Sequence, residues 1–180
     1  MTATASTHTA SVNETSEQRR GRIRAALDQN RSAMTVMVAR QLGVPEIEVV
    51  RALTPDSIEL DALRWEQLVQ AFEPLGNVHV IASNSAVTLE VFGQFGNFST
   101  WGDFFNVQSK TLDMHIRKPT IAAAFAVKKP GHMDGVPTLS FQFFAHAGDS
   151  AFKVFLTFGG KAPSAEKQAQ FDDLVVRFAQ

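Results

Sequence analysis

One strand-like segment of the chain combines a histidine with two charged residues at a spacing that suits metal chemistry. In Leu112-Asp113-Met114-His115-Ile116-Arg117, alternation places Asp113, His115 and Arg117 on one face and the apolar residues on the other. A neutral imidazole coordinates iron, and a guanidinium pairs with a carboxylate such as a haem propionate. His115 and Arg117 are therefore predicted to bind haem, with an ordinary solvated strand face as the alternative.

The other histidines differ in their predicted surroundings. His79 lies on the face of an earlier strand and is predicted to offer a second iron ligand beside His115. His132 falls in a loop between two strands, where it is either part of a lid or a polar tip. His146 precedes a hairpin turn and is expected to be solvated, and His8 lies in the N-terminal tail. The predicted metal ligands are thus His115 and His79.

A later strand adds groups that could contact a flat ligand. Alternation over residues 137–146 places Thr138, Ser140, Gln142 and Phe144 on one face. Gln142 can donate or accept a hydrogen bond, and the ring of Phe144 can stack on a macrocycle. The same residues also fit an ordinary strand surface, so both interpretations stay open at this point.

The composition excludes several classes of site and partner. The chain has 180 residues, no cysteine and a formal net charge of −1. The lack of cysteine excludes disulfides, thiolate catalysis, iron–sulfur clusters and thiolate zinc sites. Without surplus positive charge, binding to nucleic acid is not expected. Neither a serine nucleophile motif nor a phosphate-binding loop is present, so we expect a protein that is not an enzyme.

The chain carries no sign of a membrane span or an export signal. No apolar run approaches the roughly 20 residues that a membrane helix needs, and the N-terminus lacks a basic start and an apolar core. We therefore expect a soluble cytoplasmic protein. Residues 1–14 are predicted to be a disordered tail, 15–75 a helical segment, and 76–180 a sheet with a C-terminal helix, packed with the helices as one domain.

The helical segment begins with a charged helix for which Ser16 is the predicted N-cap. A second helix ends at Gly43 and a third begins at Pro45. Their connection, residues 39–44, resembles a helix-turn-helix motif. Glutamates in the third helix would face DNA phosphates, however, so a plain helical hairpin is favoured over DNA binding.

A fourth amphipathic helix is predicted over residues 60–72. In this helix Leu60, Leu63 and Leu68 would face inward and Trp65 would lie at the margin. Pro74 and Gly76 would end it.

After Gly76 the apolar period changes to two, which predicts strands. The predicted strands are 77–82, 86–92, 103–107, 111–117, 120–127, 137–146 and 151–158, followed by a helix over 163–178. Since no helix separates the strands, they should form one antiparallel sheet, and the fold class is α+β. In residues 121–127 both faces of the strand are apolar, so both need cover. An uncovered apolar face would meet a partner subunit or a flat ligand.

The order of these segments resembles the ChuX/HutX family of bacterial cytoplasmic haem-utilisation carriers. The resemblance rests on an ordered set of segments between about Leu60 and Phe178. They are Gly76-Asn77-Val78, Phe104-Phe105-Asn106, His115-Ile116-Arg117, the loop from Lys129 to Gly135, Phe141-Gln142-Phe143-Phe144 and Phe152-Lys153-Val154-Phe155.

The resemblance implies a fold, a ligand and an assembly. The fold is a curved, half-barrel-like antiparallel sheet of about nine strands with helices packed on it, similar to one half of the duplicated HemS-type haem proteins. The chain would form a homodimer. It would bind haem, or another tetrapyrrole, during iron acquisition and pass it to a degrading or storing protein. The alternatives are a haem-degrading or tetrapyrrole-reducing enzyme and an interaction protein that uses the helix-turn-helix-like segment.

The resemblance also implies roles for individual residues. His115 matches the family's strand histidine, a candidate axial ligand, while Met133, Gln142 and Phe144 fall near positions that line the haem cleft. Two positions depart from the family. Ser83 stands where the family has a second histidine, so that His79 is the substitute, and His132 stands where a phenylalanine is usual.

Overall fold

Five α-helices and nine β-strands are present in a computed structural model that describes residues 14–158 and 160–180. The helices are α1 Ser16–Gln29, α2 Thr35–Leu42, α3 Glu46–Ala52, α4 Trp65–Gln70 and α5 Ala165–Phe178. The strands are β1 Ser57–Leu60, β2 Val78–Ser83, β3 Thr88–Gly93, β4 Phe98–Trp101, β5 Phe104–Gln108, β6 Asp113–Arg117, β7 Ile121–Pro130, β8 Pro137–Ala145 and β9 Ser150–Thr157. The α+β class is confirmed. The predicted tail lies outside the described residues, apart from Glu14.

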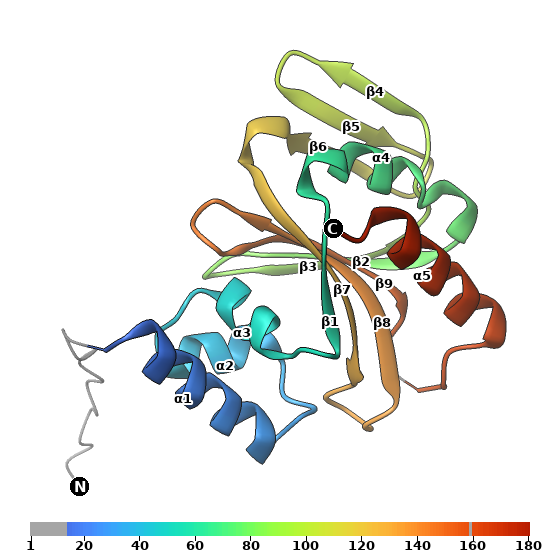
Figure 1. Ribbon diagram of the computed structural model, residues 1–180. Helices are drawn as coiled ribbons and strands as arrows, with labels where there is room; N and C mark the ends of the chain where they lie inside the picture. The colour runs from blue at the N-terminus through green and yellow to red at the C-terminus, as the bar shows by residue number, and fades with distance from the viewer. Residues whose placement is uncertain (1–13, 159) are drawn as a thin grey trace, which may run out of the picture.

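The strands form two antiparallel sheets, whereas the pattern predicted a single one. Six strands follow the order β1-β7-β8-β9-β2-β3, and a smaller sheet follows the order β4-β5-β6 (Figure 1). Residues between β3 and β4 turn the chain, with Asn97 in the left-handed region at φ 49°. Gly93 ends β3 beside the β5–β6 turn, where an added Cβ would lie 3.1 Å from the Thr111 carbonyl oxygen. After this turn, β4 pairs with β5 and not with β3, so the three-stranded sheet is separate from the six-stranded one.

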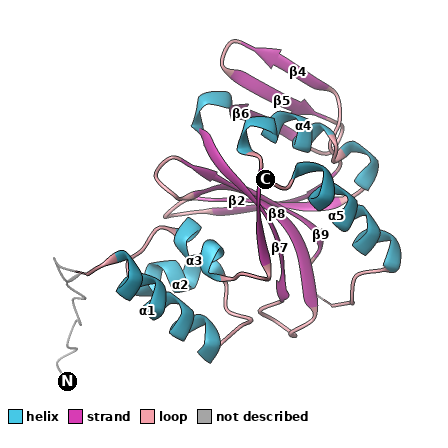
Figure 2. Ribbon diagram, viewed as in Figure 1, coloured by secondary structure: helices cyan, strands magenta, loops and turns pink. Residues whose placement is uncertain are grey.

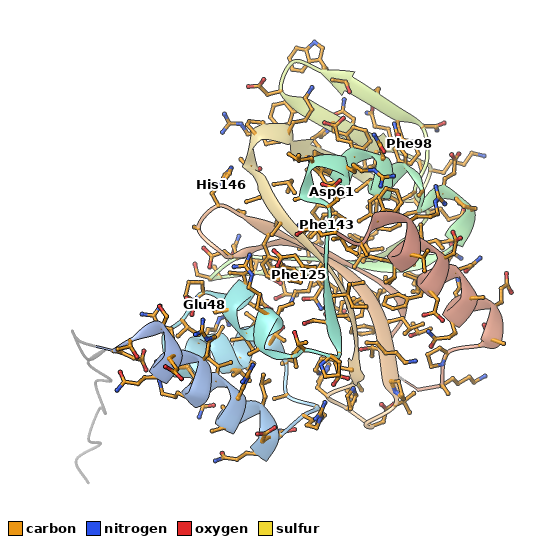
Figure 3. The ribbon with its side chains drawn as sticks, in the orientation of Figure 1. Glu48, Asp61, Phe98, Phe125, Phe143 and His146 are labelled. Carbon is orange, nitrogen blue, oxygen red and sulfur yellow. The ribbon has the colours of Figure 1, made fainter. Side chains whose placement is uncertain are left out.

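Strand β7 of the six-stranded sheet is covered on both faces, as its apolar pattern predicted. Ala124 and Ala126 of β7 face a core shared with α4, α5 and the three-stranded sheet. Ala123, Phe125 and Val127 face a second core shared with α1, α2 and α3. Figure 2 shows the two groups of helices on opposite sides of the crossing strands. In Figure 3, Phe125 and Phe143 mark the two cores.

The N-terminal helices follow their local signals closely. Thr15 caps α1 through a capping box with Gln18, one residue before the predicted cap. Gly43 ends α2 in the left-handed conformation at φ 64°, as its position predicted. α3 begins directly after Pro45. Helices α2 and α3 therefore form the expected helical hairpin, packed on the sheet.

The prediction of one helix over residues 60–72 is wrong. Leu60 ends β1, which was not predicted, and pairs with Ala124 of β7. Asp61 then caps a short 3₁₀ turn, 62–64, and α4 begins only at Trp65. As a result Leu63 is 96% exposed and Trp65 only 6% exposed, the reverse of the expected arrangement. Strand β4 was also missed, because four residues are too few to establish a period.

The burial of Trp65 and the exposure of Leu63 can be tested by measuring stability. Trp65 packs edge-on against Phe105, with ring centroids 5.5 Å apart. We expect Trp65→Ala to lower the free energy of unfolding by about 3–5 kcal/mol, because it leaves a buried void. Leu63→Ala should change it by less than about 0.5 kcal/mol. Urea unfolding followed by circular dichroism measures both, and equal losses would contradict this assignment.

Candidate functional site

A cavity of about 400 Å³ opens where the helical layer stops short of the sheet edge. It lies between α2, the start of α3, the β7–β8 turn and strands β2, β3, β8 and β9. One row of register partners explains its position: Phe125, Gln142, Lys153, Ile81 and Glu90 succeed one another across five strands. Phe125 is buried beneath the helices, and the other four line the cavity. The cavity is therefore the uncovered part of a sheet face.

The walls of the cavity are largely apolar. Phe155 and Phe158 line it from the end of β9. Three exposed methionines are among the lining residues: Met34 at the N-cap of α2, Met37 in its first turn and Met133 in the β7–β8 turn. Thioether side chains are flexible and polarisable, so they adapt to the shape of a bound ligand. Such walls suit a large apolar molecule.

A buried ion pair joins the helices to the sheet inside the cavity. Lys153 Nζ of β9 lies 2.5 Å from Glu46 Oε1 of α3, and both side chains are largely shielded from solvent. The hydroxyl of Thr35, at the start of α2, donates to the same carboxylate oxygen. Because Glu46 points inward to Lys153, it is not available on the surface of the helix-turn-helix-like segment.

Gln142 presents an unsatisfied amide group in the cavity. The residue is 3% exposed, and its Nε2 donates to Ser140 Oγ at 3.1 Å. Its Oε1 has no hydrogen-bond partner among the described residues. A buried polar atom without a partner costs about 1–3 kcal/mol. A bound molecule that hydrogen-bonds to this amide would remove that cost.

Lys129 adds a second cation to the lining. Burial and, to a smaller extent, the positive charge of Lys153 lower the pKa of Lys129 to about 8, while the Asp56 carboxylate opposes the shift. Its Nζ donates to the carbonyl oxygens of Ser32 and Pro130. An anion bound in the cavity would favour the charged form of Lys129.

The residues predicted from the sequence do not form one cluster. Met133 and Gln142 line the cavity. His79 lies beside it, with Nε2 2.9 Å from Glu90 Oε2 and its ring 4.1 Å from that of Phe158, measured between centroids. The ring of Phe144 is fully buried in the core beneath α1–α3.

His115 and Arg117 lie on the three-stranded sheet and do not line the cavity. His115 Nδ1 lies 2.7 Å from Asn106 Oδ1, and Asn106 Nδ2 donates to Ser99 Oγ. Since Asn106 directs its oxygen at the ring, Nδ1 is the donor and a neutral His115 carries its lone pair on Nε2. Nε2 is 3.5 Å from Asp113 Oδ1. This tautomer is one that can bind a metal.

Several cavity residues were missed or left uncertain by the sequence patterns. Lys153, Lys129 and Glu46 were not predicted, and His132 was interpreted only as lid or polar tip, yet all four line the cavity. One signal was present for Lys153, which interrupts an otherwise apolar strand. Ser83, at the position of the family's second histidine, lines the cavity as well.

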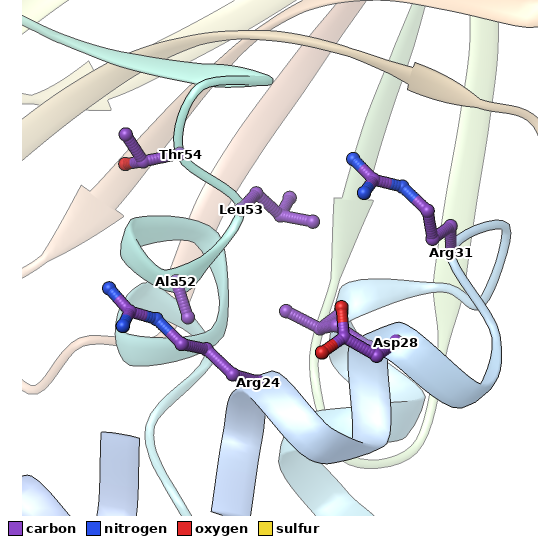
Figure 4. A pocket seen from close by; sticks show the side chains of 7 residues that line it. Arg24, Asp28, Arg31, Ala52, Leu53 and Thr54 are labelled. Carbon is purple, nitrogen blue, oxygen red and sulfur yellow. The ribbon is translucent and has the colours of Figure 1, made fainter. Parts of the chain in front are cut away.

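A second, smaller hollow lies between α1 and the end of α3 (Figure 4). It has a volume of about 120 Å³ and is lined by Arg24, Asp28, Arg31 and Thr54 over the side chains of Leu27 and Leu53. Ligand sites usually measure about 300–1,000 Å³, so this hollow is too small for a cofactor-sized molecule.

Residues 14–158 and 160–180 contain neither a cluster of metal-binding side chains nor a membrane-spanning helix. No three His, Asp or Glu side chains in this part of the chain converge as a metal site. No helix in it is long and apolar enough to cross a membrane.

Comparisons with known proteins agree on one family. Residues 58–174 match the family described as Haem utilisation ChuX/HutX. The Intracellular heme transport protein HutX of Vibrio cholerae is 23% identical over 148 residues, which cover 81% of this chain and 76% of HutX.

Solved structures show the same fold. The Heme Binding Protein ChuX has a TM-score of 0.75 at 22% identity, covering 86% of this chain and 97% of ChuX. The heme degrading enzyme ChuS of Escherichia coli O157:H7 has a TM-score of 0.73 at 22% identity, covering 90% of this chain and 46% of ChuS. The chain thus corresponds in fold to about half of ChuS.

The buried ion pair can be tested by a double-mutant cycle. Glu46→Met alone should lower the free energy of unfolding by about 3–5 kcal/mol, because Lys153 keeps a buried charge without a partner, and Lys153→Met alone should be costly because Glu46 then keeps one. Glu46→Met with Lys153→Met should lose much less, since no buried charge remains. Glu59→Ala, which breaks an exposed pair with Arg51, is the control and should cost at most about 1 kcal/mol. Additive losses in the urea-unfolding cycle would show that the two groups are not coupled.

Proposed function

Because the chain belongs to the ChuX/HutX haem-utilisation family, we propose that it binds haem in the cavity beneath α2 and carries it inside the cell to a protein that degrades or stores it. The observation that carries this proposal is the cavity itself, in which apolar walls enclose buried cationic and amide groups. The HutX relative is named as an intracellular heme transport protein, which supports a carrier.

The cavity matches the two parts of the haem molecule. Its volume of about 400 Å³ is within the usual range of ligand sites. Phe155, Phe158 and the methionine side chains would cover the apolar macrocycle. Lys129 and Lys153 would receive the carboxylates, since ammonium groups donate to them. The unpaired Oε1 of Gln142 would accept a hydrogen bond from a donor that enters the cavity.

A carrier must release its cargo, and the cavity is consistent with this requirement. The methionines that line the cavity are exposed, so the ligand would leave without unfolding of the core. We expect a dissociation constant between micromolar and nanomolar, on the order of −8 to −12 kcal/mol. The enzyme alternative has a clear signature: loss of the haem absorption bands after addition of ascorbate, in the presence of catalase, would favour a haem-degrading enzyme.

A second position for haem is the outer face of the three-stranded sheet. Alternation places His115 and Arg117 on this face, together with Trp101, which is 78% exposed. The free Nε2 of His115 would coordinate iron there, and Arg117 would pair with a propionate. We favour the cavity because it encloses its ligand. The variant His115→Ala tests the second position. If haem binds there, this variant should lose the absorption band that arises from the bond between His115 and the iron.

We also propose that the chain forms a homodimer through the open edge of the six-stranded sheet. β3 is the last strand of that sheet, and it exposes Leu89 and Phe92. Unpaired edges with apolar side chains favour pairing with another chain. Light scattering should give twice the chain mass for the wild type and the single chain mass for Phe92→Lys. Val176→Lys, at an exposed position of α5, is the control and should stay dimeric; a monomeric wild type would contradict the proposal.

Binding of haemin should depend on pH through Lys129. As pH rises through about 8, the apo protein loses the Lys129 charge, so the affinity for the haem carboxylates should fall. Lys129→Met should weaken binding at pH 7 roughly 10-fold and flatten this dependence, since a charged hydrogen bond contributes about 1.5–3 kcal/mol. Lys128→Met is the matched control, because Lys128 is exposed on the same strand. Titration of the Soret band between pH 6.5 and 9.5 measures both.

The same variant should change stability in the opposite direction. The pKa of Lys129 in the folded protein, about 8, lies below its ordinary value of 10.5. Burial of the charged form therefore lowers the free energy of unfolding, and this penalty is fully present below pH 8. This penalty is relieved as pH rises from 8 to 10.5. Lys129→Met should therefore raise the stability of the apo protein at pH 7 while it weakens haemin binding. Equal haemin affinity in the Lys129→Met and Lys128→Met variants would contradict the carboxylate role.

A further inference from the structure

The cavity brings one histidine close to its opening. Of the four histidines in the part of the chain that the structure describes, His132 alone is among the residues that line the cavity. It stands beside Met133 in the β7–β8 turn, and both residues line the cavity together with Met34 and Met37 from the N-cap and first turn of α2. The opening therefore offers one nitrogen donor and several thioethers, and both are ligands of haem iron.

The turn that carries His132 is held by two backbone–backbone hydrogen bonds and by two that the Asp134 side chain accepts. Gly131 donates to the carbonyl oxygen of Val136, and Gly135 donates to that of Gly131. The carboxylate of Asp134 accepts from the backbone N–H of Val136 at 3.0 Å and from that of Gly160 at 2.7 Å. The N–H groups of Gly160 and Val136 hold the pKa of Asp134 below its usual value. The turn is thereby fastened to the loop before α5, which restricts where the imidazole can lie.

The neighbouring histidine is less available. His79 Nε2 is 2.9 Å from Glu90 Oε2, and its ring packs on that of Phe158, so a ligand in the cavity would meet these two side chains first. His132 has neither contact and is exposed at the opening. It is also only three residues from Lys129, a separation of at most about 11 Å along an extended chain. One end of β7 can thus reach both a carboxylate and the metal centre of one ligand.

We propose that His132 is the axial ligand of the haem iron in this cavity. A ring nitrogen of the neutral imidazole donates its lone pair to the iron and displaces a coordinated water, with no change in oxidation state. This inference rests on the proposed haem-binding function and adds the residue that recognises the metal. Lys129 and Lys153 would recognise the carboxylates, so they do not distinguish haem from the metal-free porphyrin.

The test compares two ligands and two histidine variants of the full chain. Haemin and metal-free protoporphyrin IX are titrated into the wild type, His132→Ala and His146→Ala. His146 is the matched control, because it lies in an exposed turn, with Nε2 3.0 Å from the Pro119 carbonyl oxygen. Loss of an outer-shell partner already lowers metal affinity about 10–100-fold, so loss of the ligand itself in His132→Ala should cost at least ~10-fold for haemin. The affinity of His132→Ala for metal-free protoporphyrin IX should stay within about 2-fold of the wild-type value, which is far less than a 10-fold change (1.4 kcal/mol).

A spectroscopic rescue separates ligation from a structural effect. The Soret band of haemin-loaded His132→Ala should shift, and added imidazole should restore the wild-type band, whereas His146→Ala should match the wild type throughout. An unchanged Soret band and affinity in His132→Ala would overturn the role of His132 while the proposed function stands. If the iron-ligand band were lost in His115→Ala but not in His132→Ala, the role of His132 would also be overturned while the proposed function stands. If the wild type bound neither ligand, the proposed function would fail together with this inference.

Discussion

The structure depends on one constraint, that its central strands are apolar on both faces. β7 turns small alanines toward one core and Ala123, Phe125 and Val127 toward the other, so the sheet must be covered twice. Helices α4 and α5 with the three-stranded sheet cover one face, and α1–α3 cover the other only above β7 and part of β8. The rest of the second face, above β9, β2 and β3, is the cavity. The site is thus a consequence of incomplete cover.

The polar groups of the cavity link stability to binding. Lys153 and Glu46 join the helical layer to the sheet, and a buried pair of this kind is costly to break although it adds little to net stability. The unsatisfied amide of Gln142 and the buried charge of Lys129 both cost free energy in the apo protein. A ligand with carboxylates would offset the cost of the Lys129 charge, and a hydrogen-bond donor would offset that of the Gln142 oxygen. Groups that weaken the apo fold are therefore the ones that we expect to favour the bound state.

Local signals in the sequence predicted much of the fold correctly. Gly43 and Pro45 marked helix ends, and alternation placed Leu112 and Ile116 inward and His115 outward. The family was recognised from the order of segments. Predictions failed where local and tertiary preferences compete. The sequence around Leu63 has helical spacing, but pairing of Leu60 with β7 ends the helix pattern there and turns Leu63 to solvent.

By itself, then, the sequence determined the fold class and, in the strands it predicted, the face on which each side chain lies, because these depend on local patterns and a period of two. The order of the segments indicated the family. Only the tertiary structure decided which faces meet. Alternation cannot state that Gln142, Lys153 and Ile81 are register partners, that α2 and α3 stop above them, or that His115 belongs to a separate sheet. These relations arise from contacts between residues far apart in the chain, for which a local pattern carries no information. For that reason the sequence pointed to His115, whereas the cavity is lined by His132.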